Sequence, residues 1–490
     1  MQNRARDVGR EQLVTEIGDF GAIVLAVSAT VFLALLGMRL ADRFSLPYAA
    51  LFLVGAALVS EVWTDLQTVL SVKEVERIAV VSLVLILFDG GLHIGVARFR
   101  KSAGPILALG FIGTFLTAGV VALAARYLLG FSWVEAGLIG AAIAPTDPAV
   151  TFSVFGAREI RGRSGTILEG EAGMNDPVGI ALMIGMIELA TADDGSAWVV
   201  VREFSVEMTV GLSVGLAGAA LLLPVVRRVG LTGPALYPIR VLAGAGIVYG
   251  LAAVAGGSGF LAVFVAGIVL GDAAMPRKGE IEDFHSSLAG VAEIAVFVAL
   301  GLTISVGDLG ELGVWTDGFV LALVLAFVAR PLAVLPLLVP ARLHWGERIF
   351  IAWGGLKGAV PILLGALAVL ASVGAADNLY GIVFLVVLFS VIVQGSSVPY
   401  VALRLHVPLR RIDHSLAEIV ELVVGDRAFA HGRQIRDLPL GERAWIGVLV
   451  RDGRPQRIDG GVMLESGDRV HIYSQPEDVA ALRRLFEGSG

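Results

Sequence analysis

Long apolar runs alternate with short charged connections along most of this chain. Each run is close to the ~20 residues that a helix needs to cross a ~30 Å hydrocarbon core. The pattern therefore predicts an all-α polytopic membrane protein with about thirteen transmembrane helices. The thirteen runs lie near residues 20–40, 46–62, 77–96, 104–128, 134–157, 164–190, 205–226, 239–256, 258–275, 286–306, 316–341, 347–373 and 380–404.

Basic residues are distributed unevenly between the connections, which predicts an orientation. The connections after the odd-numbered runs are rich in Arg and Lys, whereas the connections after the even-numbered runs carry few of them, and the connection at 192–207 is acidic. The positive-inside rule then places the N-terminal segment, residues 1–19, outside the cell and the C-terminus in the cytoplasm. That segment shows no pattern of a removable signal peptide. The connections after the odd-numbered runs carry Arg39, Arg43, Arg98, Arg100, Lys101, Arg158, Arg161, Arg163, Arg227, Arg228, Arg277, Lys278, Arg342, Arg348 and Arg404.

The composition changes after about residue 408, so we expect a transmembrane domain over residues 20–405 and a separate domain over 406–490. "WIGVLV" and "DRVHIYS" read as strands, and "RDGRP" and "ESGDR" have turn chemistry. "PEDVAALRRLF" reads as a short helix. We therefore expect a small cytoplasmic α+β domain.

Overall composition supports the membrane assignment and excludes some chemistry. Hydrophobic residues make up 56% of the 490 residues, and the mean hydropathy is +0.81. Charged residues make up 17%, below the ~25% of typical soluble domains. The net charge of −7 gives no reason to expect a nucleic-acid partner, and the absence of cysteine excludes disulfides and thiolate metal sites.

Polar residues interrupt the fifth run in "AAIAPTDPAV". Pro145 and Pro148 flank Thr146 and Asp147, and a proline inside a helix removes a backbone donor and clashes with the preceding turn. We expect a broken helix here, with exposed carbonyl oxygens at membrane depth, as many transporters use for ion sites. The alternative is a kink in which Asp147 only caps the second half-helix.

The sixth run contains "GTILEGEAGMNDPVGIAL", which carries more charge than a lipid-facing helix tolerates. Glu171 and Asn175 are four residues apart and share a helix face, and Asp176 lies on an adjacent face. Asn175 and Asp176 are placed to meet Asp147 if the two runs pack together. Glu169, closer to the cytoplasm, is interpreted as a solvated charge.

Two further cations lie inside apolar runs. Arg330 stays charged when buried, so it needs a carboxylate partner, and Glu171 is the candidate. In "WGGLKGAVPILL", glycines, Lys357 and Pro361 resemble the arrangement of the fifth run. Two interrupted segments at corresponding positions predict inverted repeats, runs 1–6 and 8–13, with the site between them.

Three further polar residues in the apolar runs each have more than one possible role. Asp89 lies near the end of a run and is interpreted as structural. Glu293 either lines the interior or faces a partner subunit. His285, at the cytoplasmic end of its run, is interpreted as polar surface, with pH sensing as the alternative.

The chemistry that this arrangement predicts is exchange. A carboxylate at Asp176 that holds either a proton or a monovalent cation, never both, couples the two fluxes. Hydroxyl and carbonyl oxygens nearby would be further ligands for a hard cation. No "GxxxxGK(S/T)" phosphate-binding pattern is present, which argues against an ATP-driven pump. We expect a transporter without a cofactor and not an enzyme.

Several motifs together resemble the monovalent cation:proton antiporter superfamily, in its sodium/proton exchanger branch: "APTDPAV", "EGEAGMNDPVGIAL", "FVARP" and "WGGLKGAVPI". The resemblance covers about residues 20–405. The tail resembles the TrkA-C (RCK-C) domain, a pairing typical of bacterial potassium/proton antiporters.

The resemblance implies thirteen helices, a homodimer, elevator-like alternating access in the bacterial inner membrane, and an ion site where helices 5 and 12 cross. It implies that Asp176, Asp147 and Thr146 hold the monovalent cation (K⁺ or Na⁺), with Asn175 beside them. It also implies that Glu171 pairs with Arg330 and that Lys357 supports the crossing.

Details of the motifs bear on stoichiometry and selectivity. An Asn before Asp176 resembles the electroneutral members. Ala172 stands where the family often has Ser, and Lys357 stands where it usually has the Arg of "GLRG". With these two departures, the resemblance leaves the choice between K⁺ and Na⁺ open. The tail implies a small nucleotide ligand such as cyclic di-AMP, or else a dimerisation module without ligand.

We expect K⁺/H⁺ antiport and keep Na⁺(Li⁺)/H⁺ antiport through the same site as the close alternative. A ligand-gated K⁺ channel is the alternative from another class, but no "TVGYG"-type filter is present. A sensor that does not transport is a third alternative.

Overall fold

A computed structural model of the protein describes residues 47–63, 71–147, 150–151, 158–160, 162–191, 197–304, 306–311, 313–374, 376–411, 418–440, 444–456, 458–474 and 478–488, and individual positions between 21 and 36. The expected segment 1–19, most of the first expected span and Pro148 lie outside the described residues. The chain divides into two compact units, Met1–Arg410 and Arg411–Gly490.

The first unit is a bundle of helices. Its first part contains α2 (Tyr48–Val62), α3 (Val72–Leu107), η2 (Ala108–Gly113), α4 (Thr114–Leu128), α5 (Trp133–Ile143), α7 (Arg163–Thr191), α8 (Ala197–Arg228), α9 (Leu236–Val254) and α10 (Gly259–Gly271). Its second part contains α11 (Lys278–Leu302), α12 (Val306–Glu311), α13 (Trp315–Val324), η3 (Leu325–Ala329), α14 (Arg330–Leu337), η4 (Val339–Ala341), α15 (Trp345–Gly354), α16 (Ala359–Leu370), α17 (Ala376–Phe389), η5 (Ser390–Gly395) and α18 (Ser396–Arg404). Two short strands, β1 (Arg158–Ile160) and β2 (Leu409–Arg411), pair with each other.

Among the described residues, seven helices are long and apolar enough to cross a membrane. Three shorter apolar helices, α2, α5 and α10, accompany them. One of the seven runs without a gap from Val72 to Leu128 and contains two of the spans expected from the sequence. This merging is one physical reason why fewer long helices are found than the expected thirteen.

The chain changes direction inside that long run at Gly95. Its φ of 61° is a left-handed conformation that L side chains avoid. Just beyond it, the backbone N–H of Ala97 donates to a carboxylate oxygen of Asp272 over 2.5 Å. The break between the third and fourth expected spans is therefore a glycine kink held by a side chain from the segment after α10.

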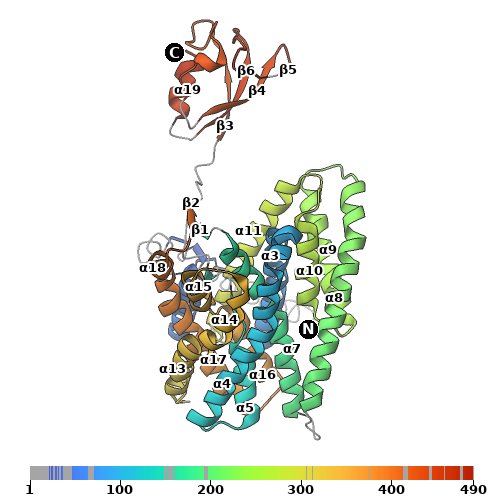
Figure 1. Cartoon of the computed structure of the whole chain (residues 1–490), viewed down its shortest axis with the longest axis vertical. Helices are drawn as coiled ribbons and strands as arrows, with labels where there is room; N and C mark the ends of the chain where they lie inside the picture. Colours follow the sequence, from blue (N-terminus) through green and yellow to red (C-terminus); the bar gives the residue numbers. More distant parts are fainter. Residues whose placement is uncertain are drawn as a thin grey trace, which may run out of the picture. The chain divides into compact units, whose positions relative to one another are not determined.

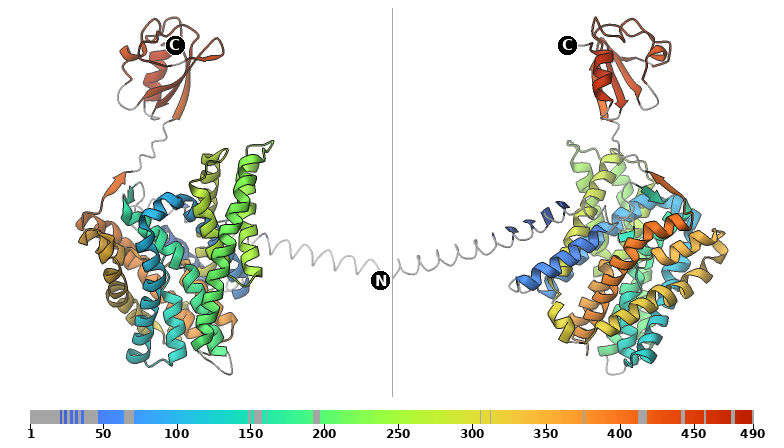
Figure 2. Two further views of the ribbon diagram at one scale, coloured as in Figure 1. Left: turned by 45° about the vertical axis from the view of Figure 1, so that its right-hand side comes forward. Right: turned by 90° about the vertical axis from the view of Figure 1, so that its left-hand side faces the viewer.

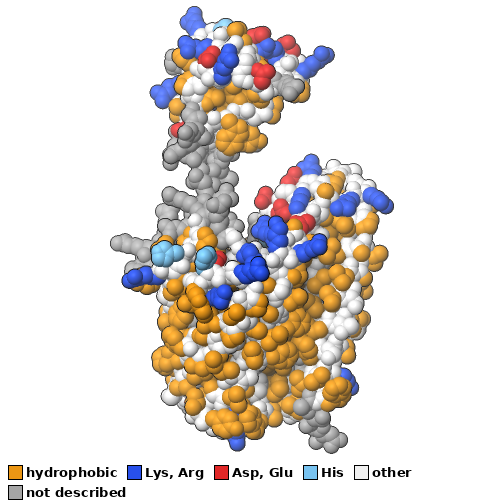
Figure 3. Space-filling view, in the orientation of Figure 1, with side chains coloured by type: hydrophobic (Ala, Val, Ile, Leu, Met, Phe, Trp, Pro, Cys, Tyr) orange, Lys and Arg blue, Asp and Glu red, His pale blue; other side chains and the backbone are white. Residues whose placement is uncertain are grey.

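The helices of the first unit are arranged around a buried centre. Helices α8, α9 and α10 lie side by side at one side of the bundle, while α13, α15 and α18 lie at the other side, with α3 and α7 between them (Figures 1 and 2). Figure 3 shows apolar side chains covering the visible face of this bundle, with Lys and Arg gathered at one of its ends. The exposed large apolar residues of the bundle include Leu221, Ile247 and Leu332. A surface of this kind suits contact with lipid.

The second unit is a small antiparallel sheet with one helix. β3 (Glu418–Val423), β4 (Trp445–Arg451), β5 (Arg454–Gln456) and β6 (Arg469–Ser474) form the order β3-β6-β4-β5, with η6 (Ile435–Asp437) in a connection and α19 (Val479–Phe486) near the end. Asp452 and Gly453 both have positive φ in the turn between β4 and β5, as a tight hairpin requires. The strands and the helix expected from "WIGVLV", "DRVHIYS" and "PEDVAALRRLF" are confirmed.

Candidate functional site

Two interrupted helical segments meet in the centre of the bundle. The first break, residues 144–147, follows the end of α5, and the second break, residues 355–358, separates α15 from α16. The backbone N–H of Asp147 donates to the carbonyl of Leu356 over 2.8 Å, so the two breaks are joined directly. These are the segments in which the sequence predicted interruptions.

The glycines of the second break allow charged side chains to approach the backbone. A Cβ atom at Gly358 would overlap the carboxylate of Asp147. A Cβ atom at Gly355 would overlap the guanidinium of Arg330. Any other residue at either position would therefore displace a charged group from the crossing.

Lys357, in the second break, is 1% exposed and lies against the end of α5. Its Nζ donates to the carbonyl oxygens of Ala144 and Pro145 over 2.7 and 2.8 Å. A cation at a helix C-terminus is favourable because the last carbonyls carry partial negative charge. These two oxygens already accept hydrogen bonds from Lys357. The sequence predicts that broken-helix carbonyls at this position serve as cation ligands, and the structure differs in this respect.

Thr146 and two residues of α7 lie together beside the crossing. The Asn175 side-chain amide donates to the Thr146 hydroxyl oxygen over 2.7 Å. Asp176 is 4% exposed. Asn175 Oδ1 and Asp176 Oδ1 are buried and have no hydrogen-bond partner among the described residues. Two consecutive residues, Asn175 and Asp176, thus each carry a buried oxygen that could accept a hydrogen bond or bind a cation.

Glu171 and Arg330 form a buried ion pair. A terminal nitrogen of Arg330 donates to Glu171, and a second one donates to the other carboxylate oxygen over 3.4 Å and to the carbonyl of Ile351 over 3.3 Å. The pair ties α7 to α14 and α15. It also neutralises Glu171, whereas no Lys or Arg among the described residues forms an ion pair with Asp176.

Asp176 and Asp147 line a cavity of about 380 Å³ between helices of the first unit. At ~30 Å³ per water molecule, the cavity holds roughly a dozen waters, so a hydrated cation fits. None of the described residues that line it is Lys or Arg. In the described part of the chain, no three His, Asp or Glu side chains are placed to hold a metal ion, so the cavity does not resemble a transition-metal site. Its polar lining residues are Tyr48, Asp89, His93, Asp147, Glu169, Asp176, Ser286 and Glu293.

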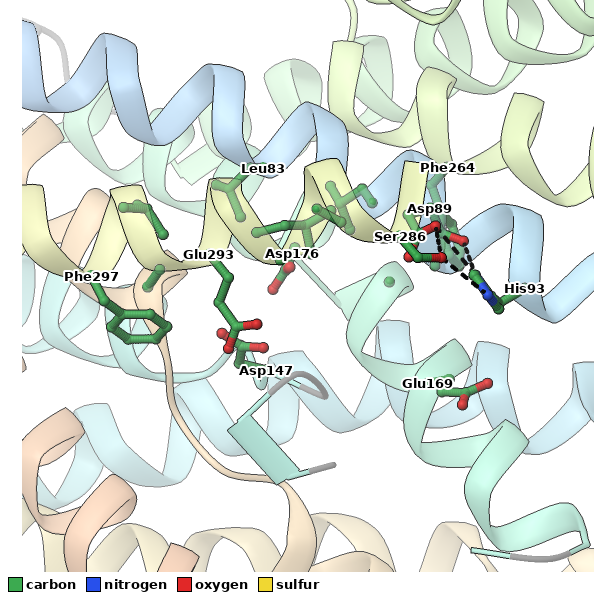
Figure 4. A pocket seen from close by; sticks show the side chains of 18 of the residues that line it. Leu83, Asp89, His93, Asp147, Glu169, Asp176, Phe264, Ser286, Glu293 and Phe297 are labelled. Atoms are coloured by element: carbon green, nitrogen blue, oxygen red, sulfur yellow. Dashed lines mark hydrogen bonds and ion pairs between the residues drawn. The ribbon is translucent and has the colours of Figure 1, made fainter. Parts of the chain in front are cut away.

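The polar residues fall into two groups along the cavity (Figure 4). At one end, a carboxylate oxygen of Asp89 accepts from Ser286 Oγ over 3.1 Å and lies 3.3 Å from His93 Nδ1. Glu169 lies toward this end. Asp89 therefore makes the structural contacts that were expected of it, and it also lines the cavity.

The two polar residues of α11 are both buried. His285 is 2% exposed, packs against the ring of Phe88, and shares a hydrogen bond of 2.7 Å between Nδ1 and the carbonyl of Ile281. The interpretation of His285 as polar surface is therefore wrong, because this part of α11 packs inward. Glu293 lines the interior, where it accepts a hydrogen bond from Tyr48. Sequence reasoning did not identify Tyr48, which follows Pro47 at the start of an apolar run.

Comparison with known proteins places this arrangement in a family. Residues 28–404 match the sodium/hydrogen exchanger transmembrane family. The chain belongs to the sodium/hydrogen exchanger family. This family match assigns the chain to the cation/proton antiporters. Residues 419–487 of this exchanger match the TrkA-C domain, as expected for the tail.

Similar proteins include antiporters named for either cation. The exchanger is 29% identical to the K(+)/H(+) antiporter NhaP2 of Shewanella sp. (strain MR-4), over 95% of this chain and 82% of that protein. It is 30% identical to the Na(+)/H(+) antiporter NhaH of Halobacillus dabanensis, over 71% of this chain and 88% of that protein. Its fold resembles that of the sodium proton antiporter MjNhaP1 from Methanocaldococcus jannaschii, with a TM-score of 0.66 and 22% identity, over 78% of this chain and 98% of that one.

The TrkA-C domain of this exchanger contains a buried carboxylate, Asp468. Arg451 donates to its two oxygens over 2.8 and 2.7 Å, and the backbone N–H of Glu465 donates over 2.8 Å. Burial opposes ionisation, but these donors outweigh it and hold the pKa of Asp468 below its ordinary value near 3.8.

We expect this carboxylate to make the TrkA-C domain sensitive to acid. Because its pKa is lower in the folded state, ionised Asp468 stabilises the fold fully above about pH 4, and the contribution is lost as the pH falls through the folded pKa. Asp468→Asn should lower the melting temperature of residues 411–490 by about 5 °C at neutral pH. The deficit should shrink below the folded pKa, which thermal melts over a pH series measure.

A surface pair offers the control for that experiment. Arg469 and Glu421 lie 3.5 Å apart and are both exposed. Arg469→Gln should change the melting temperature little at any pH, because exposed pairs contribute about 0–1 kcal/mol. An Asp468→Asn deficit of equal size at neutral and acidic pH would contradict the assignment.

Proposed function

We propose that this chain is a secondary antiporter that exchanges K⁺ for H⁺ across the inner membrane of a bacterium, and that it is a transporter and not an enzyme. The observation that carries the proposal is Asp176: a buried carboxylate with a partner-free oxygen, in an acidic cavity beside two crossing helix breaks. A carboxylate without a fixed cation is stabilised by either a proton or a mobile cation. Taking up one releases the other, which couples the two movements.

The neighbouring groups support this role. Thr146 and Asn175 supply neutral oxygens next to Asp176, and Asp147 supplies a second carboxylate from the first break. Between residues 171 and 176 of α7, Asp176 is the exchangeable carboxylate, since residue 175 is the neutral Asn and Glu171 is bound to Arg330. We therefore propose one proton per cation. A voltage-sensitive dye in proteoliposomes tests this, because one-for-one exchange builds no membrane potential.

K⁺ is the favoured cation because a relative similar over 95% of this chain is named a K(+)/H(+) antiporter and the chain carries a TrkA-C domain. The name of the relative from Halobacillus dabanensis supports Na⁺ as the alternative, and we propose Li⁺ alongside Na⁺ at the same site. The test is a proteoliposome assay with an internal pH dye, comparing additions of K⁺, Na⁺ and Li⁺. K⁺ should move protons at the lowest concentration. Cation flux that needs no proton movement would indicate a channel instead.

The architecture in the membrane is part of the proposal. We propose thirteen spans with inverted repeats within residues 20–405, an extracytoplasmic segment 1–19, and a cytoplasmic domain 406–490. The excess of Lys and Arg at one end of the bundle supports a cytoplasmic assignment for that end (Figure 3). A homodimer and elevator-like alternating access are the family's features that we extend to this chain.

The TrkA-C domain is proposed to regulate exchange by binding a small nucleotide such as cyclic di-AMP. Deleting residues 412–490 keeps β2, which pairs with β1, and removes the domain. We expect the truncated protein to exchange ions with an altered rate or pH dependence, measured in the same dye assay. Complete loss of exchange in truncated protein that is still folded and inserted would show that the domain belongs to the transport machinery.

A further inference from the structure

A third carboxylate faces Asp147 and Asp176 inside the cavity. Glu293 lies on α11, is 5% exposed and lines the same cavity. Figure 4 shows the carboxylates of Glu293, Asp147 and Asp176 directed toward one another. Glu293 therefore adds an acidic group from a helix that is neither α5 nor α7 nor part of the second break.

The two oxygens of Glu293 have different surroundings. Oε2 accepts a hydrogen bond of 2.9 Å from the hydroxyl of Tyr48, which fixes the carboxylate from α2. Oε1 is buried and has no hydrogen-bond partner among the described residues. A buried carboxylate oxygen without a partner costs free energy, so Oε1 is an acceptor that a cation in the cavity would satisfy.

An ordinary structural role does not account for this geometry. Glu171 in the same bundle shows what a structural carboxylate does here, since Arg330 neutralises it. Within the described residues, no Lys or Arg forms an ion pair with Glu293, and none lines the cavity. The other titratable groups that line the same space are Tyr48, Asp89, His93, Asp147, Glu169 and Asp176.

We propose that Glu293, held by Tyr48, supplies a cation-facing carboxylate oxygen to the transport cavity and sets its affinity for the cation. This inference rests on the proposed function and adds a carboxylate from α11 to the acidic lining that the first break and α7 contribute. α11 packs against α2 and α3. A cation in the cavity would then be held between two groups of helices rather than by the crossing alone.

The test separates affinity from turnover. Glu293→Gln keeps the size of the side chain but removes its charge, and it should raise the KM for K⁺ about tenfold while the rate at saturating K⁺ stays near wild type. Glu293→Asp should restore part of the affinity. Asp283→Asn is the matched control, because Asp283 is an exposed acid on the same helix, and it should leave KM unchanged.

Direct binding distinguishes this inference from the proposed function. Calorimetry on detergent-purified protein with KCl, against choline chloride, should show about tenfold weaker K⁺ binding in Glu293→Gln. If wild-type protein binds K⁺ but exchanges nothing, the proposed function fails while weaker binding in the variant still supports the inference. If Glu293→Gln has the wild-type KM and binds K⁺ as tightly as the wild type, the inference about Glu293 is wrong. A lower rate at saturating K⁺ with an unchanged KM would also contradict it.

Tyr48→Phe keeps the test decisive if Glu293→Gln does not yield folded protein. It removes one hydroxyl and frees the carboxylate to turn, so it should raise KM in the same direction by a smaller factor. Wild-type KM and K⁺ binding in Tyr48→Phe would then overturn the inference.

Discussion

Asp176→Asn should abolish cation-coupled proton movement in proteoliposomes. The amide has the shape of the carboxyl group but takes up no proton and offers a cation no negative charge. The rest of the site, including the hydrogen bond between Asn175 and Thr146, does not depend on the carboxylate charge. We expect dye signals at the level of protein-free vesicles for K⁺, Na⁺ and Li⁺ alike.

The same helix provides a control for this result. Glu188 is partly exposed near the other end of α7 and does not line the cavity. Glu188→Gln should exchange ions at close to the wild-type rate. Normal exchange by Asp176→Asn would eliminate Asp176 as the carrier of proton and cation.

Arg330→Gln should cause the largest loss of stability among the substitutions considered. It leaves Glu171 buried without its cation, and breaking a buried pair in this way costs about 3–5 kcal/mol. The substitution also removes the donor to the Ile351 carbonyl. We expect a much lower melting temperature for the detergent-purified protein, measured by intrinsic fluorescence.

Two further variants identify the cause. Glu171→Gln combined with Arg330→Gln should recover part of the stability, because no buried charge is left unpaired. Arg277→Gln, which breaks the exposed pair with Glu280, should change the melting temperature little. If Arg330→Gln and Arg277→Gln melt at the same temperature, the buried pair does not contribute as proposed.

Much of the candidate site could be predicted from the sequence because polar residues are costly in an apolar helix. Prolines and glycines around Thr146 and Lys357 predicted two breaks, and both are present. A buried guanidinium requires a carboxylate partner, so the sequence predicted that Arg330 pairs with Glu171, and the structure contains this ion pair. In the tail, alternating apolar residues and turn chemistry were enough to place β4, β6 and α19.

Other features depend on packing that the sequence does not encode locally. In a membrane helix, apolar residues cover both the lipid-facing and the buried face, so periodicity does not show which way His285 and Glu293 point. Tyr48 and Glu293 are 245 positions apart, and only the packing of α2 on α11 brings them together. Likewise, the reach of Lys357 to the carbonyls of Ala144 and Pro145 follows from the crossing itself.

Lys357 has a consequence for movement. Its ammonium holds the end of α5, and its backbone N–H donates to Ser390 Oγ of η5 over 2.9 Å. Lys357 thus links the second break both to the end of α5 and to η5. Separating the two breaks would leave the buried Lys357 amino group and the two carbonyl oxygens without their hydrogen bonds, which costs free energy. Under the alternating access proposed above, we therefore expect the two breaks to move together as one piece.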